Sequence, residues 1–539
     1  MSSFFKRLKK KQNSIHREAV KEKKAISTSL SANLELVKQR TGNSYDISIR
    51  TLKIGEGSPK CLAIIFIEGL VDTKAINEKI VESIMRKSFP EHDSSQHLIQ
   101  SLTDEGIAIG SIKTVNTQEE LFLALMDGNT IILLDGTDQA IIANTAGGET
   151  RSIQEPESQV SVRGPRDGFT ESIQTNISLV RRRIRNPDLW VESMKIGKKT
   201  KTNVAIMYLN GNANEKIVAE VRQRLKKIDI ESILESGYIE QLIEDQAFTT
   251  FPTLYHTERP DAVAGNILEG RIAIFVDGTP YVLLAPAVFI QFFQSVEDYY
   301  ARFDIITALR FLRILTFFIS IIAPSVYIAS TTFHQEMIPT QLVIIIAAQR
   351  ENVPFPAFVE ALIMEITFEI LREAGIRMPR AVGSAISIVG ALVIGQAAVQ
   401  AGIVSPAMVI IVSITAIANF ATPSFTMAIS ARLIRFLFMF SAAVFGLYGV
   451  ILGVILLAVH LCALRSFGVP YMTPLAPISP DNVGGDTLVR APLWKTREKA
   501  NLIMKQGENV YSEDMDKPKP PLGRGIITRK KKKGDTDEN

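Results

Sequence analysis

The sequence has few cysteines and lacks the short motifs that mark most enzymes. Its two cysteines, Cys61 and Cys462, lie in different halves of the 539-residue chain, so they form no disulfide framework and no metal-ligand pattern. The phosphate-binding pattern GxxxxGK[ST], the zinc-protease pattern HExxH and the esterase pattern GxSxG are absent, and the six histidines show no metal spacing. We therefore expect no enzymatic activity, no bound metal and no cofactor.

A large excess of charge and a secretory signal are also missing. The net charge of +4 gives nucleic-acid binding no support. The basic run Phe4–Lys11 is not followed by the apolar core of a signal peptide, which predicts a cytoplasmic N-terminal half. We expect residues 1–44 to be basic and disordered. This run and Arg529–Lys533 are either solvated tails or segments attracted to an anionic membrane surface.

Charge is absent from two long apolar runs in the second half. Ile314–Ser330 and Leu437–Leu461 contain no Asp, Glu, Lys or Arg and are close to the ~20 residues that cross a bilayer core. The sequence therefore predicts a multi-pass α-helical membrane domain at 293–465 and a polar tail at 466–539 that is disordered at its end. The candidate spans are 311–331, 381–404, 405–430 and 433–463.

Basic residues set the expected orientation of the first span. Arg302, Arg310 and Arg313 precede it, and Lys and Arg are enriched on cytoplasmic flanks, so we expect this span to start in the cytoplasm. The final apolar stretch is long for one crossing and short for two. The sequence therefore leaves the side of the C-terminal tail open.

The soluble half contains a hidden repeat. LAIIFI at 62–67 matches VAIMYL at 204–209, and Asp127–Ala143 matches Glu269–Ala285, both at an offset of 142 residues (204 − 62 and 269 − 127). Each copy has an apolar run typical of a buried strand, then a helical pattern, then two apolar runs joined through Asp-Gly-Thr, which is a hairpin signal. The matches predict a cytoplasmic α/β domain made of two tandem repeat units, at 45–150 and 195–292.

Residues 151–194 are expected to link the two units. A helix is predicted from Thr170 to Ile184, and its last turn contains Arg181, Arg182 and Arg183, where cations suit the helix dipole. These three arginines are either a site for an acidic partner or members of local ion pairs.

One helix in the membrane half contains several ionisable residues. Glu365, Glu369 and Glu373 recur at i, i+4 and i+8 and share one face, whereas Glu360 lies well round the helix from them. Charges at membrane depth are costly and mark functional sites. In an oligomer this helix can form carboxylate rings that favour cations.

The alternative for this helix is an interfacial position in which its glutamates pair with Arg372, Arg377 or Arg380. In the next candidate span, Gln396 and Gln400 share a face. They either line a water-filled path or pack against other polar groups between helices.

Long strings in the chain also carry a family resemblance. They are RGPRDGFTES (163–172), NISLVRRRI (176–184), TERPD (257–261), VDGTP (276–280), FHQEMIPTQL (333–342), VPFPAFVEALIMEITFEILREAGIRMP (353–379) and LRSFGVPYMTP (464–474). From about residue 40 to 495 the chain resembles the A subunit of bacterial spore germinant receptors, the GerA family. It has GPRDG where members usually have GPREG. The resemblance singles out the motif residues Arg163, Gly164, Pro165 and Arg166.

The resemblance implies a multi-pass protein of the spore inner membrane with two partners, a transporter-like B subunit that takes the nutrient and a lipoprotein C subunit. It also implies a ring of A subunits, pentameric, that opens as an ion channel and releases monovalent cations. A signalling scaffold that does not conduct ions and a substrate transporter are the alternatives. The candidate pore or gating residues are Glu360, Glu365, Glu369, Gln396 and Gln400.

Overall fold

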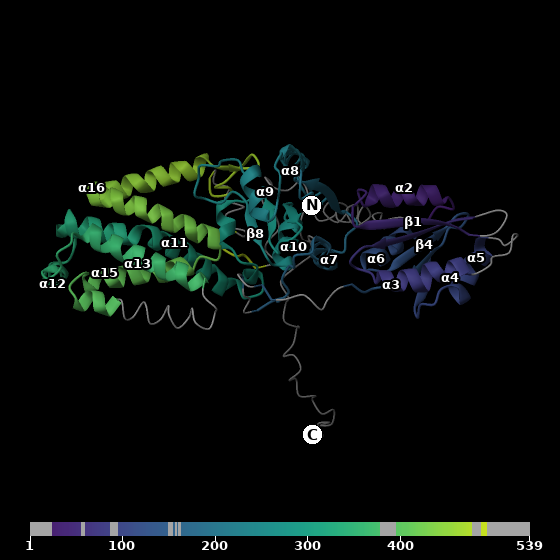
Figure 1. The fold of residues 1–539 in the computed structure, drawn as a ribbon, viewed down its shortest axis with the longest axis horizontal. Helices are drawn as coiled ribbons and strands as arrows, with labels where there is room; N and C mark the ends of the chain where they lie inside the picture. The colour runs from purple at the N-terminus through teal and green to yellow at the C-terminus, as the bar shows by residue number, and fades with distance from the viewer. Residues whose placement is uncertain are drawn as a thin grey trace, which may run out of the picture.

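The computed structural model describes residues 24–54, 60–86, 95–148, 155–156, 159, 163–377, 395–476 and 487–492. The molecule is elongated, with two α/β units in a row and a helical half at one end (Figure 1). We call the unit farther from the helices unit 1 and the nearer one unit 2.

Each unit is built on a five-stranded antiparallel sheet. The strand order is β1-β2-β4-β5-β3 in unit 1 and β6-β7-β9-β10-β8 in unit 2. The strands are β1 (Ile47–Ile54), β2 (Lys60–Ile67), β3 (Ile112–Val115), β4 (Thr130–Leu134), β5 (Ala140–Ala143), β6 (Leu189–Ile196), β7 (Thr202–Leu209), β8 (Tyr255–Thr257), β9 (Ile272–Val276) and β10 (Val282–Ala285).

The two sheets are two copies of one fold. β1 begins at Ile47 and β6 at Leu189, and β4 begins at Thr130 and β9 at Ile272, so equivalent strands are offset by 142 residues. The Asp-Gly-Thr segments connect β4 to β5 and β9 to β10 as hairpins. The middle glycines have φ of 83° and 91°, a region that glycine enters at little cost.

Each copy starts earlier than the sequence predicted, with a helix of its own. α2 (Leu30–Arg40) precedes β1, and α7 (Ile173–Arg183) precedes β6. The expected disorder of residues 1–44 is therefore wrong for α2. Likewise, α7 and β6 are parts of unit 2 rather than of a linker at 151–194. These residues were assigned to a linker because the equivalent helix of unit 1 is mostly polar and was not recognised in the sequence.

The two first helices are fixed in the same way. The backbone N–H of Leu30 donates to Asp135, and that of Ile173 donates to Asp277, the aspartates of the two hairpins. An asparagine side chain in each helix, Asn176 in the second, closes the loop before the helix by two hydrogen bonds to one backbone residue. The repeat therefore includes the hydrogen bonds that fix the start of the first helix in each unit.

Helices cover both faces of each sheet. In unit 1, α2 and α6 pack on one face and the helices between β2 and β3 pack on the other. In unit 2, α7 and α10 cover one face and α8 and α9 the other. These helices are α3 (Thr73–Ala75), α4 (Glu82–Arg86), α5 (Ser95–Ser101), α6 (Gln118–Met126), α8 (Glu215–Lys227), α9 (Ser236–Ile243) and α10 (Pro260–Leu268), with π-helical turns η1 (Ile76–Val81) and η2 (Leu102–Gly106).

An aromatic connector joins unit 2 to the helical half. It consists of two 3-10 turns, η3 (Phe289–Phe293) and η4 (Val296–Tyr299). Phe289 and Phe293 pack edge-on against Phe317 of the first long helix, with ring centroids 6.1 and 5.0 Å apart. One hydrophobic core therefore continues from unit 2 into the helices.

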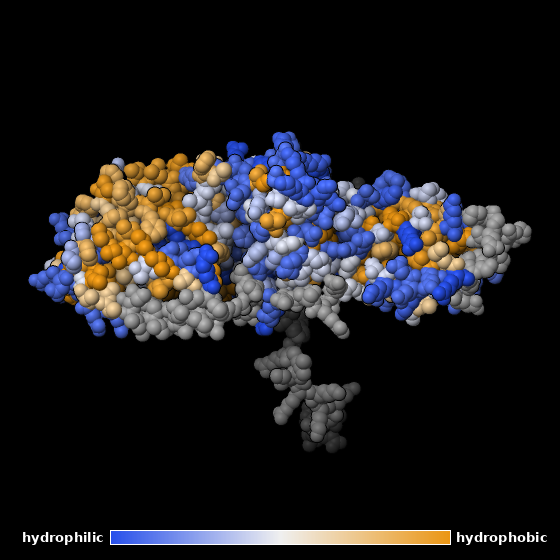
Figure 2. Space-filling view, in the orientation of Figure 1, coloured by the Kyte–Doolittle hydropathy of each residue, from blue (hydrophilic) through white to orange (hydrophobic). Residues whose placement is uncertain are grey.

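The helical half consists of α11 (Phe303–Thr332), η5 (Gln335–Met337), α12 (Thr340–Arg350), α13 (Ala357–Arg377), α15 (Pro406–Phe420) and α16 (Phe425–Ala463), followed by the small hairpin β11 (Arg465–Ser466) and β12 (Val469–Pro470). Among the described residues, α11 and α16 are long and apolar enough to cross a membrane, and α15 is a shorter apolar helix. Hydrophobic surface is concentrated on this end (Figure 2). Most of the span expected at 381–404 lies outside the described residues.

α16 reverses direction at Gly446, where φ is 62° and ψ is −144°. Near one end of α16, Ser430 donates to the carbonyl of Thr250. Near the other end, His460 Nε2 lies 3.0 Å from Thr249 Oγ1. Both ends therefore return to unit 2, and the last apolar stretch is a helical hairpin whose following segment packs on the same side as the soluble units.

Candidate functional site

α13 is the charged helix of the helical half, and it begins directly after Pro356. Glu360 and Glu365 on this helix are buried, with 0% and 5% of their surface exposed. A charge buried among apolar helices is stable only with close partners. The partners of these glutamates therefore define the site.

Glu360 lies against the start of α15. Its Oε2 accepts a hydrogen bond from the backbone N–H of Ser405, the residue that caps α15, at 2.9 Å. Arg350, at the end of α12, places Nε 3.2 Å from Glu360 Oε1. The N-terminal end of a helix carries a partial positive charge that stabilises a carboxylate. Through these two contacts, Glu360 of α13 binds both α12 and α15.

Glu365 forms the central ion pair. Its Oε2 lies 2.5 Å from Nη1 of Arg435 on α16, and both side chains are almost fully buried. Arg435 Nε also donates to the carbonyl of Ser320 on α11 at 2.6 Å. That carbonyl is available because Pro324, four residues later, has no N–H to bond to it. A proline inside an apolar helix thus creates the acceptor that orients Arg435.

The remaining glutamates of α13 are also paired. Glu369 pairs with Arg432 of α16 and lies 3.7 Å from Arg372. Glu373 and Arg377 form an exposed i,i+4 pair at 2.6 Å. The predicted carboxylate stripe is therefore neutralised along its length within one subunit. Two of its partners, Arg432 and Arg435, come from α16, which the sequence did not connect with it.

This ionic network is not fully satisfied. Glu365 Oε1, Arg435 Nη2, Arg432 Nε and Arg372 Nε are buried and have no hydrogen-bond partner within the described part of the chain. Buried polar atoms without partners cost free energy, more so when charged. A different arrangement of these helices, or contact with a neighbouring chain, would gain the most free energy by giving these atoms hydrogen-bond partners.

Gln396 and Gln400 lie one turn apart on helical residues 395–400, and both are exposed. Within the described part of the chain, neither side chain forms a hydrogen bond with the charged residues of α13. The structure thus places Glu360 and Glu365 in the interior, whereas Glu369, Gln396 and Gln400 are exposed.

The three arginines of α7 make three different contacts. Arg181 is buried and donates to Asp46 of unit 1 at 2.7 and 2.9 Å. Arg182 donates to the carbonyl of Gly147 at 2.9 Å, also in unit 1. Arg183 is held by an aspartate of the preceding loop at 2.6 Å. These contacts favour the ion-pair interpretation over an acidic-partner site.

The motif residues Arg163, Gly164, Pro165 and Arg166 form an exposed loop before α7. Arg166 Nη1 lies 3.4 Å from Glu155, and both side chains are mostly exposed, so the pair adds little stability. The loop is therefore a surface feature of the soluble domain.

The chain is similar to known proteins along most of its length. The model of the family described as Bacillus/Clostridium GerA spore germination protein matches residues 35–502. The chain belongs to the GerA family. Spore germination protein KA of Bacillus subtilis (strain 168) is 60% identical over 95% of this chain and 93% of its own length. Spore germination protein GerLA of Bacillus cereus is 41% identical over 82% of this chain and 89% of its own length.

A solved structure also matches this GerA-family chain. The crystal structure of the N-terminal domain of the A subunit of the Bacillus megaterium spore germinant receptor GerK3 is 46% identical, with a TM-score of 0.40. The match covers 50% of this chain and 100% of that chain. Together with the family match, the relatives identify the chain as an A subunit of germinant receptors.

Sequence reasoning missed a charge cluster where unit 2 of this GerA-family chain meets α11. Asp298 of η4 is fully buried, with Arg310 Nε at 3.1 Å and Arg313 Nη1 at 2.9 Å. From the sequence, these arginines were expected only to form a basic membrane flank. An acidic residue twelve positions before the first arginine was the available signal, but nothing in the sequence shows that the chain turns back at this point.

A second ionic group lies on the same side of unit 2. Arg259 donates to Asp261 at 3.0 and 2.7 Å, and Tyr300, directly after η4, donates to Asp261 at 2.9 Å. Burial alone would raise the pKa of Asp261, but these hydrogen bonds lower it overall. Burial and the adjacent carboxylate raise the pKa of Tyr300 to about 12. The connector is therefore attached to α10 by charge as well as by packing.

Proposed function

We propose that this chain is the ion-conducting subunit of a nutrient-sensing spore germination receptor. Copies of the chain form a ring, a partner subunit takes the nutrient, and the ring then opens to release monovalent cations. The observation that carries this proposal is the line of paired charges on α13. Ionisable groups inside apolar helices are costly and commonly mark ion pathways or gates.

In this proposal the ion pairs keep the gate closed. While Glu365 and Glu369 are bound to Arg435 and Arg432, their carboxylates are not available to a cation. A movement of the part of α16 before Gly446 that separates these pairs would free two carboxylates one turn apart, that of Glu365 buried and that of Glu369 half exposed. The buried atoms without partners reduce the cost of such a movement, because the closed network is incompletely satisfied.

We assign Gln396 and Gln400 to the lumen of the ring. Amide groups facing lipid hydrocarbon are unfavourable because nothing there can bond to them. Their exposure on the single chain therefore supports contact with water or with another copy. Neutral amides can coordinate a cation without holding it tightly, which suits conduction.

The proposed receptor lies in the spore inner membrane, with the soluble units in the cytoplasm. Arg302, Arg310 and Arg313 at the unit 2 end of α11 support this orientation, because basic flanks stay cytoplasmic. A transporter-like B subunit and a lipoprotein C subunit complete the assembly, and the ring contains five A subunits.

The test is cation flux from liposomes that contain this chain with its two partner subunits, with and without a nutrient mixture. Glu365→Gln should raise flux in the absence of nutrient, because it weakens the central closed-state pair. Gln396→Ala should change conductance at an unchanged nutrient threshold. Glu373→Gln, in an exposed pair, is the matched control. Flux equal to wild type in both folded test variants would refute this assignment of gate and lumen.

A second function, a signalling scaffold that assembles germination proteins without conducting ions, is favoured by the exposed loop with Arg163 and Arg166. It predicts that Arg163→Glu with Arg166→Glu abolishes the germination response of spores. Under the channel proposal, nutrient-triggered flux from liposomes persists in this variant. Absence of any flux from complexes that bind nutrient would favour the scaffold.

A further inference from the structure

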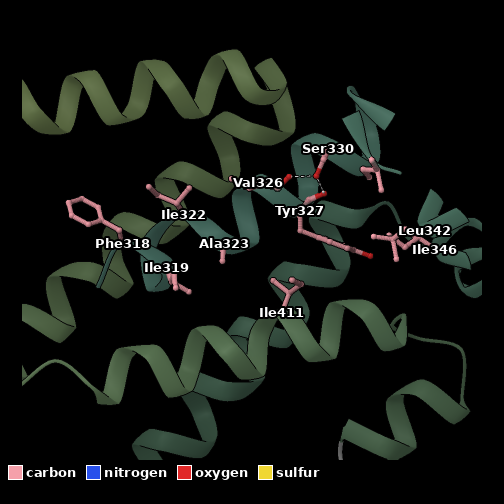
Figure 3. Close-up of a pocket in the computed structure, with 11 residues that line it drawn as sticks. Phe318, Ile319, Ile322, Ala323, Val326, Tyr327, Ser330, Leu342, Ile346 and Ile411 are labelled. Carbon is pink, nitrogen blue, oxygen red and sulfur yellow. Dashed lines mark hydrogen bonds between the residues drawn. The ribbon is translucent and has the colours of Figure 1, made fainter. Parts of the chain in front are cut away.

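Two open hollows of the molecule differ in what surrounds them. One lies between α11, α12 and α15 and has an apolar lining that includes Phe318, Ile322 and Ile411 (Figure 3). In the proposed membrane this lining needs no protein partner, because lipid hydrocarbon covers it. The other lies in unit 1 between α6, β3 and β5, has a volume of about 320 Å³ and is called here the unit 1 groove. Because it belongs to a soluble unit, its apolar side chains meet water unless another segment covers them.

The unit 1 groove combines apolar and charged side chains. Val115 of β3, Leu123 of α6 and Ile142 of β5 supply apolar surface, and Leu123 is 62% exposed. Its charged side chains, among the described residues, are those of Lys113, Glu120 and Asp127.

The equivalent groove of unit 2 is covered by the connector. α10 begins 142 residues after α6 (260 − 118), and β8 pairs with β10 in the register in which β3 pairs with β5. Phe292 of the connector packs against Tyr255 of β8, with ring centroids 5.6 Å apart, and is only 1% exposed. Tyr255 is the equivalent of Lys113 (255 − 113), which lines the unit 1 groove. Both units therefore form this groove, and in unit 2 an aromatic segment of the chain fills it.

The chain after β5 does not cover the groove of unit 1. The carbonyl of Gly147 accepts a hydrogen bond from Arg182 of unit 2. Gln159 Oε1 accepts one from Thr257 Oγ1 of unit 2 at 2.6 Å. Beyond Asn144, no described residue of this stretch lines the groove. Any cover for unit 1 must therefore come from another part of the chain or from a partner.

One acidic residue beside the groove indicates the charge of this cover. Glu119 of α6 is the equivalent of Asp261 of α10 (261 − 119), which is bound by Arg259 and by Tyr300 directly after the connector. In unit 1, Thr117 stands in the place of that arginine. Within the described part of the chain, Glu119 forms no hydrogen bond or ion pair. A cover that matches this groove therefore brings positive charge as well as apolar side chains.

The described chain begins at the end of this groove. The carbonyl of Lys24 accepts the backbone N–H of Gln118, the first residue of α6, at 2.9 Å. Residues 1–23 precede Lys24 and lie outside the described residues. They contain eight Lys or Arg and two Glu, together with Phe4, Phe5, Leu8 and Ile15. The nine residues of α6 span about 13 Å, whereas 23 extended residues reach up to about 76 Å, so the segment is long enough to cover the groove.

We propose that residues 1–23 dock in the unit 1 groove and cover it as the connector covers the groove of unit 2. Apolar side chains of the segment pack on Leu123, and its basic side chains pair with Glu119 and Glu120. Unit 1 lies farther from the helical half than unit 2 does (Figure 1), so docking keeps the basic segment away from an anionic membrane surface. The inference concerns the soluble domain alone and does not depend on ion conduction.

The first experiment identifies what lies over Leu123 in the full chain. Leu123 is replaced by the photoreactive residue p-benzoylphenylalanine, the protein is placed in liposomes that contain phosphatidylglycerol, and crosslinked peptides are mapped by mass spectrometry. Crosslinks should join this position to residues 1–23 of the same chain. Met85 of α4, 70% exposed at the other face of the sheet, is the matched control position and should give no such crosslinks.

Glu119→Lys with Glu120→Lys tests the contribution of charge. Two attractive contacts become repulsive, so the crosslink yield from position 123 should fall about fivefold. Glu78→Lys with Glu82→Lys, at the other face of the sheet, is the matched control and should leave the yield unchanged. All four side chains are exposed, and melting temperatures verify that both variants fold.

Deletion of residues 1–23 tests the cover without a bulky probe. A maleimide should alkylate Leu123→Cys about tenfold faster in the deletion variant than in the full chain, because the docked segment protects this position. Met85→Cys should react equally fast in both. Equal rates at position 123, or crosslinks from it to a second copy, would overturn the inference. Crosslinks that form in detergent but not in these liposomes would overturn it in favour of a segment bound to the anionic membrane.

Discussion

The guanidinium of Arg181 lies 2.7 Å from the carboxylate of Asp46, and both side chains are buried between the two repeat units. Arg181 belongs to the first helix of unit 2, and Asp46 directly precedes the first strand of unit 1. A second ion pair crosses in the opposite direction, because Arg40 of unit 1 lies 3.0 Å from Asp188 of unit 2, the residue equivalent to Asp46. The aspartate before the first strand of each unit therefore pairs with an arginine on the first helix of the other unit.

Asp46→Asn should destabilise the soluble domain by about 3–5 kcal/mol, because it leaves the buried Arg181 without its counter-charge. Thermal unfolding followed by the fluorescence of Trp190 will measure this, since its indole donates to the carbonyl of Arg40 between the units. The control is Arg185→Gln, whose pair with Asp127 is exposed and should be worth less than about 1 kcal/mol. Equal losses in the two variants would contradict a special role for the buried pair.

Glu365→Gln should lower the stability of the helical half by about 3–5 kcal/mol, because Arg435 stays buried without a carboxylate. The double variant Glu365→Gln with Arg435→Gln should recover a large part of this loss, since neither residue is then charged. Melting temperatures of the four proteins in detergent form a double-mutant cycle. Additive losses would show that the two side chains do not interact.

Gly446→Ala should disrupt the hairpin of α16. At φ 62° and ψ −144° a side chain costs about 1–3 kcal/mol, and the added Cβ would lie 2.8 Å from His334 Cε1. Gly265→Ala is the matched control, since a Cβ there meets nothing within 4 Å and an alanine in α10 should stabilise by up to about 1 kcal/mol. Both melting temperatures are measured on the full chain. An unchanged value for Gly446→Ala would refute the strained turn.

The stability of unit 2 should depend on pH through Glu240. Burial, reinforced by the nearby charges of Glu244 and Glu235, raises the pKa of Glu240 to about 7. The folded state then holds a proton that the unfolded state releases near pH 4.5, so this contribution to stability falls as pH rises from about 4.5 to 7. The loss amounts to at most about 3 kcal/mol.

His256, whose Nδ1 lies 3.9 Å from Glu240, acts in the opposite direction. Burial lowers the pKa of His256, so its contribution to stability rises with pH up to about 6.5. Melting temperatures of wild type and Glu240→Gln between pH 5 and 8 isolate the glutamate, because the histidine is common to both. As pH rises, the melting temperature of Glu240→Gln should increase relative to that of wild type. A constant difference between the two melting temperatures would show that Glu240 titrates normally.

The repeat was predictable because both copies keep their strand patterns at one offset. The first helix of unit 1 was missed, and that of unit 2 was predicted but not recognised as part of the repeat. The two helices lie at a different offset, 143 rather than 142, as shown by Leu30 and Ile173 at their starts. Their shared signal, Asn-x-x-Leu-Val, begins at Asn33 and Asn176 and is short. Such a match becomes convincing only when the asparagines are seen to close the same loop.

The candidate site was predictable only in part. The sequence identified the glutamates of α13 but not their partners, because Arg435 is 70 residues from Glu365 and Arg432 is 63 residues from Glu369. Side-chain pairing over such distances depends on how helices pack, which local spacing does not encode. The reversal of α16 at Gly446 could not be predicted either, because the sequence does not specify the backbone φ of this glycine.

The connector between unit 2 and α11 has a consequence for the order of biosynthesis. Phe289 donates its backbone N–H to the carbonyl of Tyr471, and Ser466 bonds to the backbones of Ala287 and Thr253. Residues synthesised after α16 thus complete the packing of a domain that is synthesised much earlier. Until α16 has been translated, the aromatic rings of the connector lack this cover. A nascent chain truncated before the last hairpin should therefore recruit chaperones and be degraded, even though both soluble units are already present.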